Sequence, residues 1–379
     1  MAMQFMRKAT KTIFISCNAL VSVILILGCY GTRINNGDYW FMGLFTLAAF
    51  YFLIINVIFL IFWLFIKPSI MLIGIITILI CWVPLRQVFQ LRTEAAFNYK
   101  KNDSSLRVMS WNVEHFNILE HKLHPEKKYE MINLINECKP DIACFQEMVA
   151  SDSSPTAINY LPDFEKRLDM YEYHFSYNPK LDFDGKHRFG IILFSKYPII
   201  KKETIASNPY SYNSIFQYVD IVKEKDTFRI FNIHLQSLKF SKDNRQYLED
   251  PSIKNGEDLK ESKSIINKFK IGFIKRHRQS DWVKREMNKS PYPVIVCGDF
   301  NDVPNSYAYN NIGNGMSNAF VEKGSGIGNT FYSISPTLRI DNIFVDKRFD
   351  VQQYIRVKKK LSDHYPIITD LLFHKKPID

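Results

Sequence analysis

Short apolar runs beyond residue 105 end in polar side chains that can bind a metal ion or a phosphate group. The runs are rich in β-branched residues, as buried strands are. Loops at strand ends converge on common sites, so we expect these polar side chains to meet in one place. In chain order they are Asn112, Gln146, Glu147, Asn232, His234, Asp299, Asn301, Asp302, Asp341, Asp363 and His364.

The residue types suit metal-assisted cleavage of a phosphoester. Hard divalent ions such as Mg²⁺ take oxygen ligands, usually one or two carboxylates, and keep several waters. Glu147, helped by Asn112 and one aspartate, fits that need. Cleavage also requires a water to lose a proton and the leaving oxygen to be neutralised. Asp299 and Asn301 stand two residues apart in a turn, where they can orient the attacking water together.

Two histidines and a further aspartate complete the set. His234 and His364 titrate near physiological pH and can donate hydrogen bonds to phosphate oxygens. Asp341 can hold a histidine in one tautomer. Each motif alone also has a structural reading, since Gly-Asp-Phe-Asn is a common tight turn and Ser-Asp-His often caps a helix. The presence of all of them in one chain favours the catalytic reading.

Hydrophobic periodicity indicates the elements that would position these residues. Apolar residues in 129–138 fit one face of a helix, and further helices are expected near 257–273 and 281–288. Strands with interspersed helices indicate a layered α/β sandwich. We expect strands at 106–111, 142–145, 189–194, 218–222, 228–233, 294–297, 340–345 and 367–372.

The order of these motifs resembles that of the endonuclease/exonuclease/phosphatase superfamily over about residues 104–375. The resemblance implies a four-layered α/β sandwich of two mixed β-sheets flanked by helices. It also implies a metal-dependent phosphoric ester hydrolase that uses Mg²⁺, with Mn²⁺ as a substitute. The matching segments are 110–113, 145–147, 190–196, 232–235, 298–301, 339–344 and 362–366.

The resemblance assigns the metal and the water to separate residues. Glu147 is expected to be the principal metal ligand, with Asn112 and Asp363 near the ion. Asp299 is expected to activate or orient the water, with Asn301 beside it.

The resemblance further implies that His364, paired with Asp341, binds and polarises the phosphate. His234 matches a histidine that assists the leaving group in pancreatic-type deoxyribonucleases and neutral sphingomyelinases. Abasic-site endonucleases carry a different polar set there, so a repair role is not expected.

Three long uncharged runs precede this region, at residues 12–32, 40–66 and 68–85. A bilayer core of roughly 30 Å needs about 20 apolar helical residues to cross it. Trp40, Trp63 and Trp82 lie toward the ends of the runs, as interfacial rings do. We therefore expect three transmembrane helices.

These helices define the expected domains. Residues 1–92 would form a membrane anchor, 93–105 a linker and 106–379 the catalytic domain. A cleaved signal peptide is the alternative for the first run, because basic residues precede it. The third run is the shortest and can lie partly in the membrane interface.

Loop charges bear on orientation. Arg7, Lys8 and Lys11 favour a cytoplasmic N-terminus, and Lys67 suits the same side. An odd number of spans then places the catalytic domain outside the cytoplasmic membrane. Arg86 and Arg92 argue the other way.

Charge and cysteine content limit other functions. The formal net charge is +11, of which the first 93 residues carry +6, so the remainder is only mildly basic for a nucleic-acid binder. Cys138, Cys144 and Cys297 lie in apolar segments without paired spacing, which indicates buried thiols.

One basic segment, about 238–273 and the residues just after it, is longer than the family's usual connection. It reads either as a solvated helix face or as an arm that contacts a polyanion or a lipid headgroup. Its basic residues are Lys254, Lys260, Lys263, Lys268, Lys270, Lys275, Arg276 and Arg278.

Three functions remain open. The family favours a nuclease that acts on DNA or RNA outside the cytoplasm. A phosphodiesterase or phosphatase acting on sphingomyelin-like or inositol headgroups suits a chain tethered to the lipid bilayer. A non-catalytic membrane scaffold is disfavoured because every site position holds a chemically competent residue. The sequence leaves open the oligomeric state, the number of ions, and a diester or a monoester substrate.

Overall fold

The computed structural model describes residues 2–33, 39–151, 158–177, 187–206, 215–238, 240, 243–244, 247 and 256–376. The helices are α1 (Ala2–Tyr30), α2 (Met42–Ile66), α3 (Pro68–Ile80), α4 (Trp82–Val88), α5 (Lys127–Cys138), α6 (Leu161–Arg167), α8 (Gly256–Asn288), α9 (Tyr307–Gly313) and α10 (Ala319–Lys323), with the short 3₁₀ segments η1 (Gly31–Arg33) and η3 (Glu114–Glu120). The strands are β1 (Leu106–Asn112), β2 (Ile142–Ser151), β3 (Glu172–Tyr177), β4 (His187–Ser195), β5 (Ile199–Ala206), β6 (Ile215–Lys223), β7 (Asp226–His234), β8 (Val294–Asp299), β9 (Met316–Asn318), β10 (Asp341–Asp346), β11 (Phe349–Arg356) and β12 (Ile367–Phe373).

The strands form two six-stranded sheets, ordered β11-β12-β1-β2-β4-β3 and β5-β6-β7-β8-β10-β9. Strands β1 and β2 run parallel, as do β7 and β8, and the other neighbouring pairs described are antiparallel. Both sheets are therefore mixed, and each holds one parallel pair near its centre.

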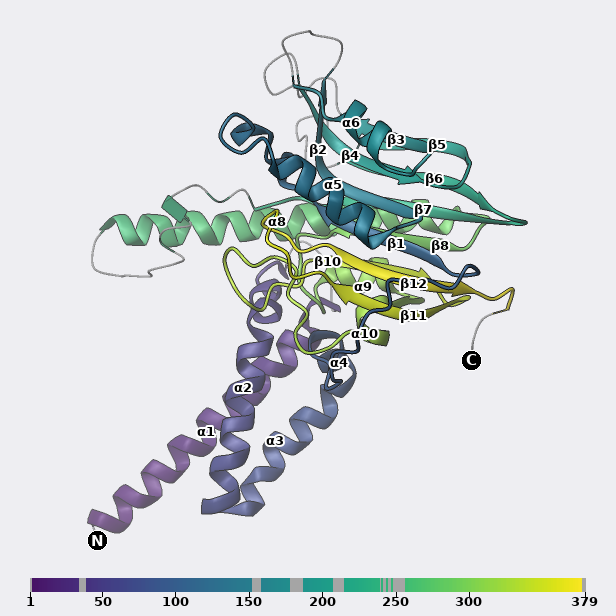
Figure 1. Cartoon of the computed structure of the whole chain (residues 1–379). Helices are drawn as coiled ribbons and strands as arrows, with labels where there is room; N and C mark the ends of the chain where they lie inside the picture. Colours follow the sequence, from purple (N-terminus) through teal and green to yellow (C-terminus); the bar gives the residue numbers. More distant parts are fainter. Residues whose placement is uncertain are drawn as a thin grey trace.

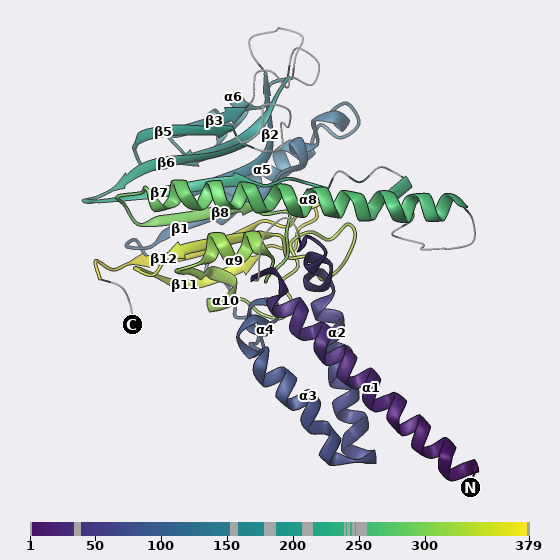
Figure 2. The ribbon, with the colours of Figure 1, turned by 180° about the vertical axis from the view of Figure 1, so that it is seen from behind.

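The two sheets pack face to face, with helices on their outer faces (Figures 1 and 2). Strand β1 shows the cause, because its side chains alternate between two cores. Leu106 and Val108 enter the core between the sheets, while Met109 and Trp111 enter the core under the helices. Helices α5 and α6 cover the first sheet, and α8 and α9 cover the second. These layers confirm the predicted four-layered α/β sandwich.

Several predicted elements differ in extent from those observed. The two helices expected at 257–273 and 281–288 are one continuous helix, α8. Strands β3, β5, β9 and β11 were not expected from periodicity. Cys138, Cys144 and Cys297 are buried free thiols, as predicted.

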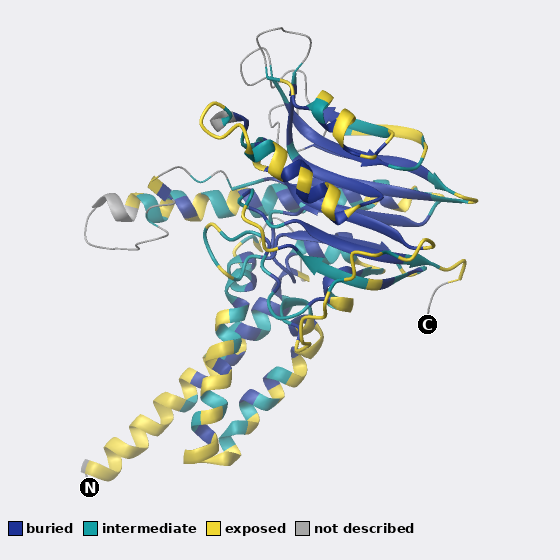
Figure 3. Ribbon diagram, in the orientation of Figure 1, coloured by how far each residue is buried: buried dark blue, intermediate teal, exposed yellow. Residues whose placement is uncertain are grey.

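The N-terminal helices extend away from the sandwich as a bundle whose surface is largely exposed and apolar (Figure 3). Helices α1 and α2 are each long and apolar enough to cross a membrane. The third run is broken instead, because α3 and α4 meet at a bend of 69°. Trp63 is buried within the bundle and is not an interfacial ring, contrary to expectation.

Proline explains the bend. In a continuous helix the amide of residue 84 would bond to the carbonyl of Ile80, but Pro84 has no N–H. The Tyr30 hydroxyl donates to that carbonyl instead, at 2.6 Å. Helix α3 has 13 residues and is about 20 Å long, less than a bilayer core. The chain thus has two or three candidate spans.

The bundle is bound directly to the sandwich. Gln90 and Gly326 exchange two backbone hydrogen bonds of 2.9 Å, and the Asn305 side chain donates to the carbonyl of Pro84 at 3.0 Å. Arg339 donates to the carbonyl of Gln87, and Arg92 to carbonyls in α10. These contacts fix the sandwich on the bundle.

A buried ion pair gives a test of this fold. Arg107 donates to Asp370 through Nε at 2.6 Å and Nη2 at 2.8 Å, and it is fully buried. Asp370→Asn should destabilise the protein by about 3–5 kcal/mol, because it leaves a buried charge without its partner. The control is Asp346→Asn, whose partly exposed pair with Arg348 should cost less than about 1 kcal/mol. Thermal unfolding of the full chain in detergent measures both, and equal losses would contradict the prediction.

Candidate active site

The polar residues singled out in the sequence gather at one edge of the sandwich because strand register places them there. Asn112 ends β1, His234 ends β7 and Asp299 ends β8. His234 is paired with Asp299 across the parallel strands β7 and β8. Asp341 begins β10 and is paired with Asp299 from the other side. A row of three site residues thus lies across neighbouring strands.

Glu147 reaches the site through a local irregularity of β2. The pairing of β2 with β4 shifts between Phe145 and Met148, and Glu147 has a φ of 59°. Such a bulge re-aims a side chain and is common beside active sites. The Glu147 carboxylate faces two histidines, with Oε2 at 3.5 Å from His115 Nε2 and Oε1 at 3.7 Å from His234 Nε2.

Asp299 is the most connected carboxylate of the site. Its Oδ1 accepts a hydrogen bond from the Asn301 amide at 2.7 Å, and its Oδ2 accepts one from Asn112 Nδ2 at 3.1 Å. Oδ2 also lies 3.6 Å from His234 Nε2 and 3.8 Å from His364 Nε2. Gly298 permits the close packing of β8 against β7 beside Asp299, since a Cβ on residue 298 would lie 1.9 Å from the carbonyl oxygen of Ile233.

His364 is fixed from several sides. Its Nδ1 lies 2.8 Å from Asp341 Oδ2, so Nδ1 carries the proton of that hydrogen bond. Its amide donates to Ser362 Oγ at 3.1 Å, and its carbonyl accepts from Trp111 Nε1 at 2.9 Å. Nε2 is thereby directed toward two carboxylates of the site, at 3.8 Å from Asp299 Oδ2 and 3.9 Å from Asp363 Oδ1.

Residues 109–364 match the model of the Endonuclease/Exonuclease/phosphatase family. The chain belongs to this family. Residues 11–88 match a second model, described only as a domain of unknown function. No curated protein matches the chain.

Solved structures of family members share the fold. The Bacteroides vulgatus protein is 19% identical, with a TM-score of 0.52 over 71% of this chain and 99% of that one. The Bacteroides thetaiotaomicron protein is 18% identical, with a TM-score of 0.51 over 71% and 98%. The Beutenbergia cavernae protein is also 18% identical, with a TM-score of 0.51 over 73% of each chain. Family membership makes the chain a metal-dependent phosphoric ester hydrolase.

The described residues offer a divalent ion a fitting place. Ligand atoms of Asp299, Asp341 and His364 all lie within 4.8 Å of one another, and all three residues are buried. Asp341 Oδ1 and His234 Nε2 are buried without a hydrogen-bond partner among the described residues. Adjacent carboxylates and unpartnered polar atoms favour a bound cation or a polar ligand. This cluster differs from the ligand set that the sequence predicted, Asn112, Glu147 and Asp363.

Burial and neighbouring charges shift the pKa values of the site residues in different directions. Burial and the Asp341 charge raise the pKa of Asp299 from 3.8 to about 7. Burial lowers the pKa of His234 to about 4, so this ring is neutral at physiological pH. Burial alone would also lower the pKa of His364, but Asp341 and Asp299 raise it well above its usual value. Burial would raise the pKa of Glu147, yet His234 and the other nearby histidines lower it.

Two further residues lie at the site that were not predicted from the sequence. Glu114 and His115 lie two and three residues after Asn112, in a turn where residues 114–117 all have positive φ. Glu114 Oε2 accepts a hydrogen bond from the amide of Asp363 at 3.0 Å. The only signal in the sequence was their place beside a strand end.

Other predicted residues have structural roles. Asn232 is buried between the sheets, where its Nδ2 donates to the carbonyls of Phe145 and Ile192 at 3.2 and 2.9 Å. Gln146 donates to Asn232 Oδ1 at 2.7 Å. Asp302 accepts from Arg276 Nε at 3.0 Å. Asn232 and Gln146 thus tie the two sheets together behind the site.

The reading of the basic segment as a solvated helix face fails for part of it, and its reading as an arm that contacts a polyanion or a lipid headgroup stays a prediction. Arg276 is buried and bonded to Asp302, so it is not part of a solvated face. Lys270 lies over the Trp40 ring at 5.9 Å, whereas Lys254 lies outside the described residues.

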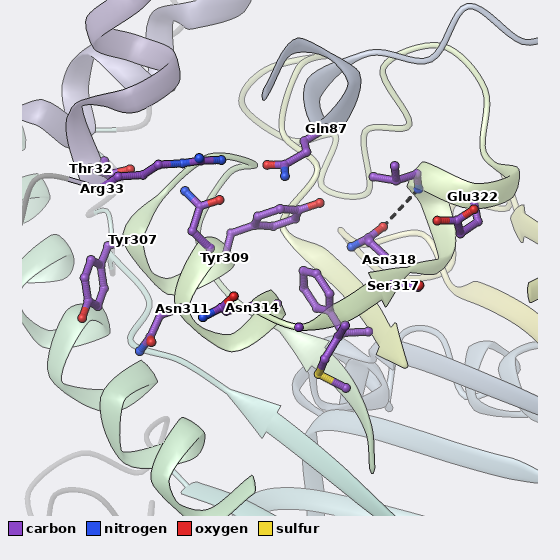
Figure 4. Close-up of a pocket in the computed structure, with 16 residues that line it drawn as sticks. Thr32, Arg33, Gln87, Tyr307, Tyr309, Asn311, Asn314, Ser317, Asn318 and Glu322 are labelled. Atoms are coloured by element: carbon purple, nitrogen blue, oxygen red, sulfur yellow. Dashed lines mark hydrogen bonds between the residues drawn. The ribbon is translucent and has the colours of Figure 1, made fainter. Parts of the chain in front are cut away.

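Two cavities of similar size lie near the junction of the bundle and the sandwich. The site residues line a cavity of about 510 Å³. A second cavity, of about 530 Å³, lies between η1, α4, α9 and α10 (Figure 4). Amides and tyrosines line it, and Glu322 is the one carboxylate among its described lining residues. The second cavity therefore lacks the paired carboxylates and histidines of the site.

The raised pKa of Asp299 predicts how stability depends on pH in the metal-free protein. The folded state holds a proton up to about pH 7, whereas the unfolded chain releases it near 3.8. This contribution is therefore fully present below the unfolded pKa and lost as the pH rises through the folded one. Thermal unfolding in EDTA should show a fall in melting temperature between about pH 4 and 7. Asp299→Asn should flatten this fall, and the exposed control Glu94→Gln should not. Burial and the Asp363 charge also raise the pKa of Glu114 to about 7, so part of the fall will remain in Asp299→Asn, but a fall as steep as in the wild type would contradict the assignment.

Proposed function

We propose that this protein is a membrane-anchored, Mg²⁺-dependent phosphodiesterase that hydrolyses its substrate by in-line attack of water, with Mn²⁺ as a substitute ion. Glu147, Asp299 and His364 converge on one cavity, with His234 packed against the two carboxylates and Asp341 bonded to His364, and this convergence carries the proposal. A bound divalent ion would stabilise negative charge on the phosphoryl oxygens. Glu147, Asn112 and Asp363 would hold it.

The aspartate and asparagine of the turn after β8 would handle the water. Asp299 is held by the Asn301 amide and side chain at 2.7 and 3.2 Å, so its carboxylate cannot swing away. In the metal-free protein, burial and the Asp341 charge raise its pKa, so this carboxylate is more basic than an ordinary aspartate. Asp299 would accept the proton of the water, and Asn301 would keep the carboxylate in place.

The two histidines would have different tasks because their charges differ. His364 is the cationic ring, held by Asp341, and its Nε2–H would donate to a phosphoryl oxygen. His234 is neutral and lies between Glu147 and Asp299. Its Nε2, which has no hydrogen-bond partner among the described residues, would bond to the leaving oxygen or to a water beside it.

The same chemistry admits a nucleic acid or a phospholipid headgroup as the phosphodiester, and it also admits a phosphomonoester. A nuclease is the substrate class that the family favours, and it rests on the family name alone. Neither the site geometry nor the mild charge of the sandwich selects a polynucleotide.

Substitution of the site tests the reaction class. Full-length enzyme in detergent should hydrolyse bis-p-nitrophenyl phosphate with Mg²⁺ or Mn²⁺ and lose that activity in EDTA. Glu147→Gln, Asp299→Asn and His364→Asn should each lower kcat by about 10² or more, the scale of a lost acid–base or electrostatic contribution. The control Glu94→Gln, at an exposed pair with Lys358, should keep wild-type kcat. Turnover in EDTA would refute the mechanism, and so would wild-type activity in two of the three substituted enzymes.

We also propose that the protein is integral to the cytoplasmic membrane, with its catalytic domain extracytoplasmic. Arg7, Lys8 and Lys11 lie near the free end of α1, and Lys67 joins α2 to α3 at the bundle end away from the sandwich (Figure 1). Basic loops are retained in the cytoplasm, which supports this orientation.

Protease accessibility tests the orientation. In spheroplasts of a bacterium that produces the protein, added protease should digest the catalytic domain without lysis, because that domain would face outward. A cytoplasmic marker protein serves as the control for leakage. Digestion seen only after lysis would reverse the assigned orientation.

A further inference from the structure

We propose that the substrate is a membrane phospholipid whose phosphoester reaches the site sideways from the bilayer, with its acyl chains against helix α2. This inference rests on the proposed function, because the lipid would be cleaved by the same site. Water would add to phosphorus, one P–O ester bond would break, and the leaving oxygen would take the proton. The inference therefore concerns which phosphoester reaches the site and how.

The cavity that holds the site has an apolar wall built partly from the bundle. Leu47 and Tyr51 of α2 line it together with Glu147, Asp299 and His364. The Tyr51 hydroxyl lies 3.1 Å from Ser335 Oγ, which joins α2 to the loop before β10. A helix long and apolar enough to cross a membrane is therefore part of the catalytic cavity. A helix that served only as a tether would not need to contribute such a wall.

Aromatic and aliphatic side chains continue this wall. Phe269 and Phe273 of α8 stack at 5.8 Å between ring centroids, and Phe240 lies 5.9 Å from Phe269. Phe331, Ile334 and Leu338 line the cavity from the loop before β10. A soluble, strongly charged substrate would gain nothing from these surfaces, whereas acyl chains would.

The level of Tyr51 along α2 places this wall at the membrane boundary. Large apolar side chains of α2 are exposed from Tyr51 to Ile66, and the charged Lys67 follows. At about 1.5 Å per residue this stretch is about 24 Å long, less than the roughly 30 Å of a bilayer core. With Lys67 at its far boundary, the hydrocarbon layer would extend to Tyr51 or past it toward the sandwich. Lipid chains would then adjoin the cavity directly.

Helix α8 lies across the sandwich end of α1 and α2 (Figures 1 and 2). It touches α2 closely, since a Cβ on Gly43 would lie 2.8 Å from the Phe273 ring. Lys270 lies over Trp40, and Ile266 and Ile271 are 48% and 45% exposed. Helix α8 thus suits the headgroup region of the leaflet that supplies the substrate.

A matched pair of leucines on α2 tests the inference. Leu47 lines the cavity, and Leu64 is exposed on the same helix, nearer its far end. Full-length wild type, Leu47→Ala and Leu64→Ala would be reconstituted into vesicles of phosphatidylcholine, phosphatidylethanolamine and phosphatidylglycerol. Release of water-soluble phosphorus or headgroup alcohol would be compared with turnover of bis-p-nitrophenyl phosphate in the same vesicles, and with turnover of single-stranded DNA and RNA.

We expect the wild type to cleave a vesicle lipid. Leu47→Ala should lower the ratio of lipid to soluble turnover by about tenfold, the order of one lost apolar contact. Leu64→Ala should leave that ratio unchanged. Cleavage of the soluble diester without lipid cleavage would overturn the inference and leave the proposed function intact. Faster cleavage of DNA or RNA than of lipid, or an unchanged ratio in Leu47→Ala, would also overturn it. No turnover of any substrate would overturn the proposed function as well.

Discussion

Two buried carboxylates, Asp299 and Asp341, face each other across adjacent antiparallel strands, and the rest of the site follows from keeping them there. Side by side in a low dielectric, they repel each other and resist ionisation. The cationic ring of His364 offsets this repulsion, because its Nδ1 bonds to Asp341 and its Nε2 faces Asp299. The remaining hydrogen-bond capacity of Asp341 is left unmet among the described residues. The site is thus assembled in a state that favours binding of a further positive charge or a polar ligand.

Much of this architecture was legible in the sequence because its causes are local. Short β-branched runs predicted the strands, and polar residues at their ends predicted where His234, Asp299 and Asp341 would meet. Motif order supplied the layered sandwich and the family. These inferences succeed because the period of a strand and the residue at its end are properties of a few consecutive residues.

The features that the sequence did not reveal depend on contacts between distant segments. Glu147 reaches the site through a bulge whose partner is β4, and no glycine marks that positive φ. The sequence predicted Asn232 as a site residue, but strand pairing points its side chain into the space between the two sheets. Pro84 breaks the third apolar run, and only the structure shows that Tyr30 takes over the carbonyl this leaves open. The apolar wall of the cavity is likewise made by helices far apart in the chain.

The paired backbone hydrogen bonds between Gln90 and Gly326 limit how the membrane anchor can be exchanged, whether by engineering or in evolution. An anchor joined only by a linker can be exchanged for any other hydrophobic segment without loss. Here the segment after α4 forms an antiparallel β-bridge with a loop of the sandwich, and α2 closes one side of the site cavity. A chimera that carries this sandwich on a foreign membrane helix would keep its carboxylates and histidines but have an open flank. The membrane bundle and the sandwich therefore pack as one structural unit, and a change in the contacts of either would have to be matched in the other.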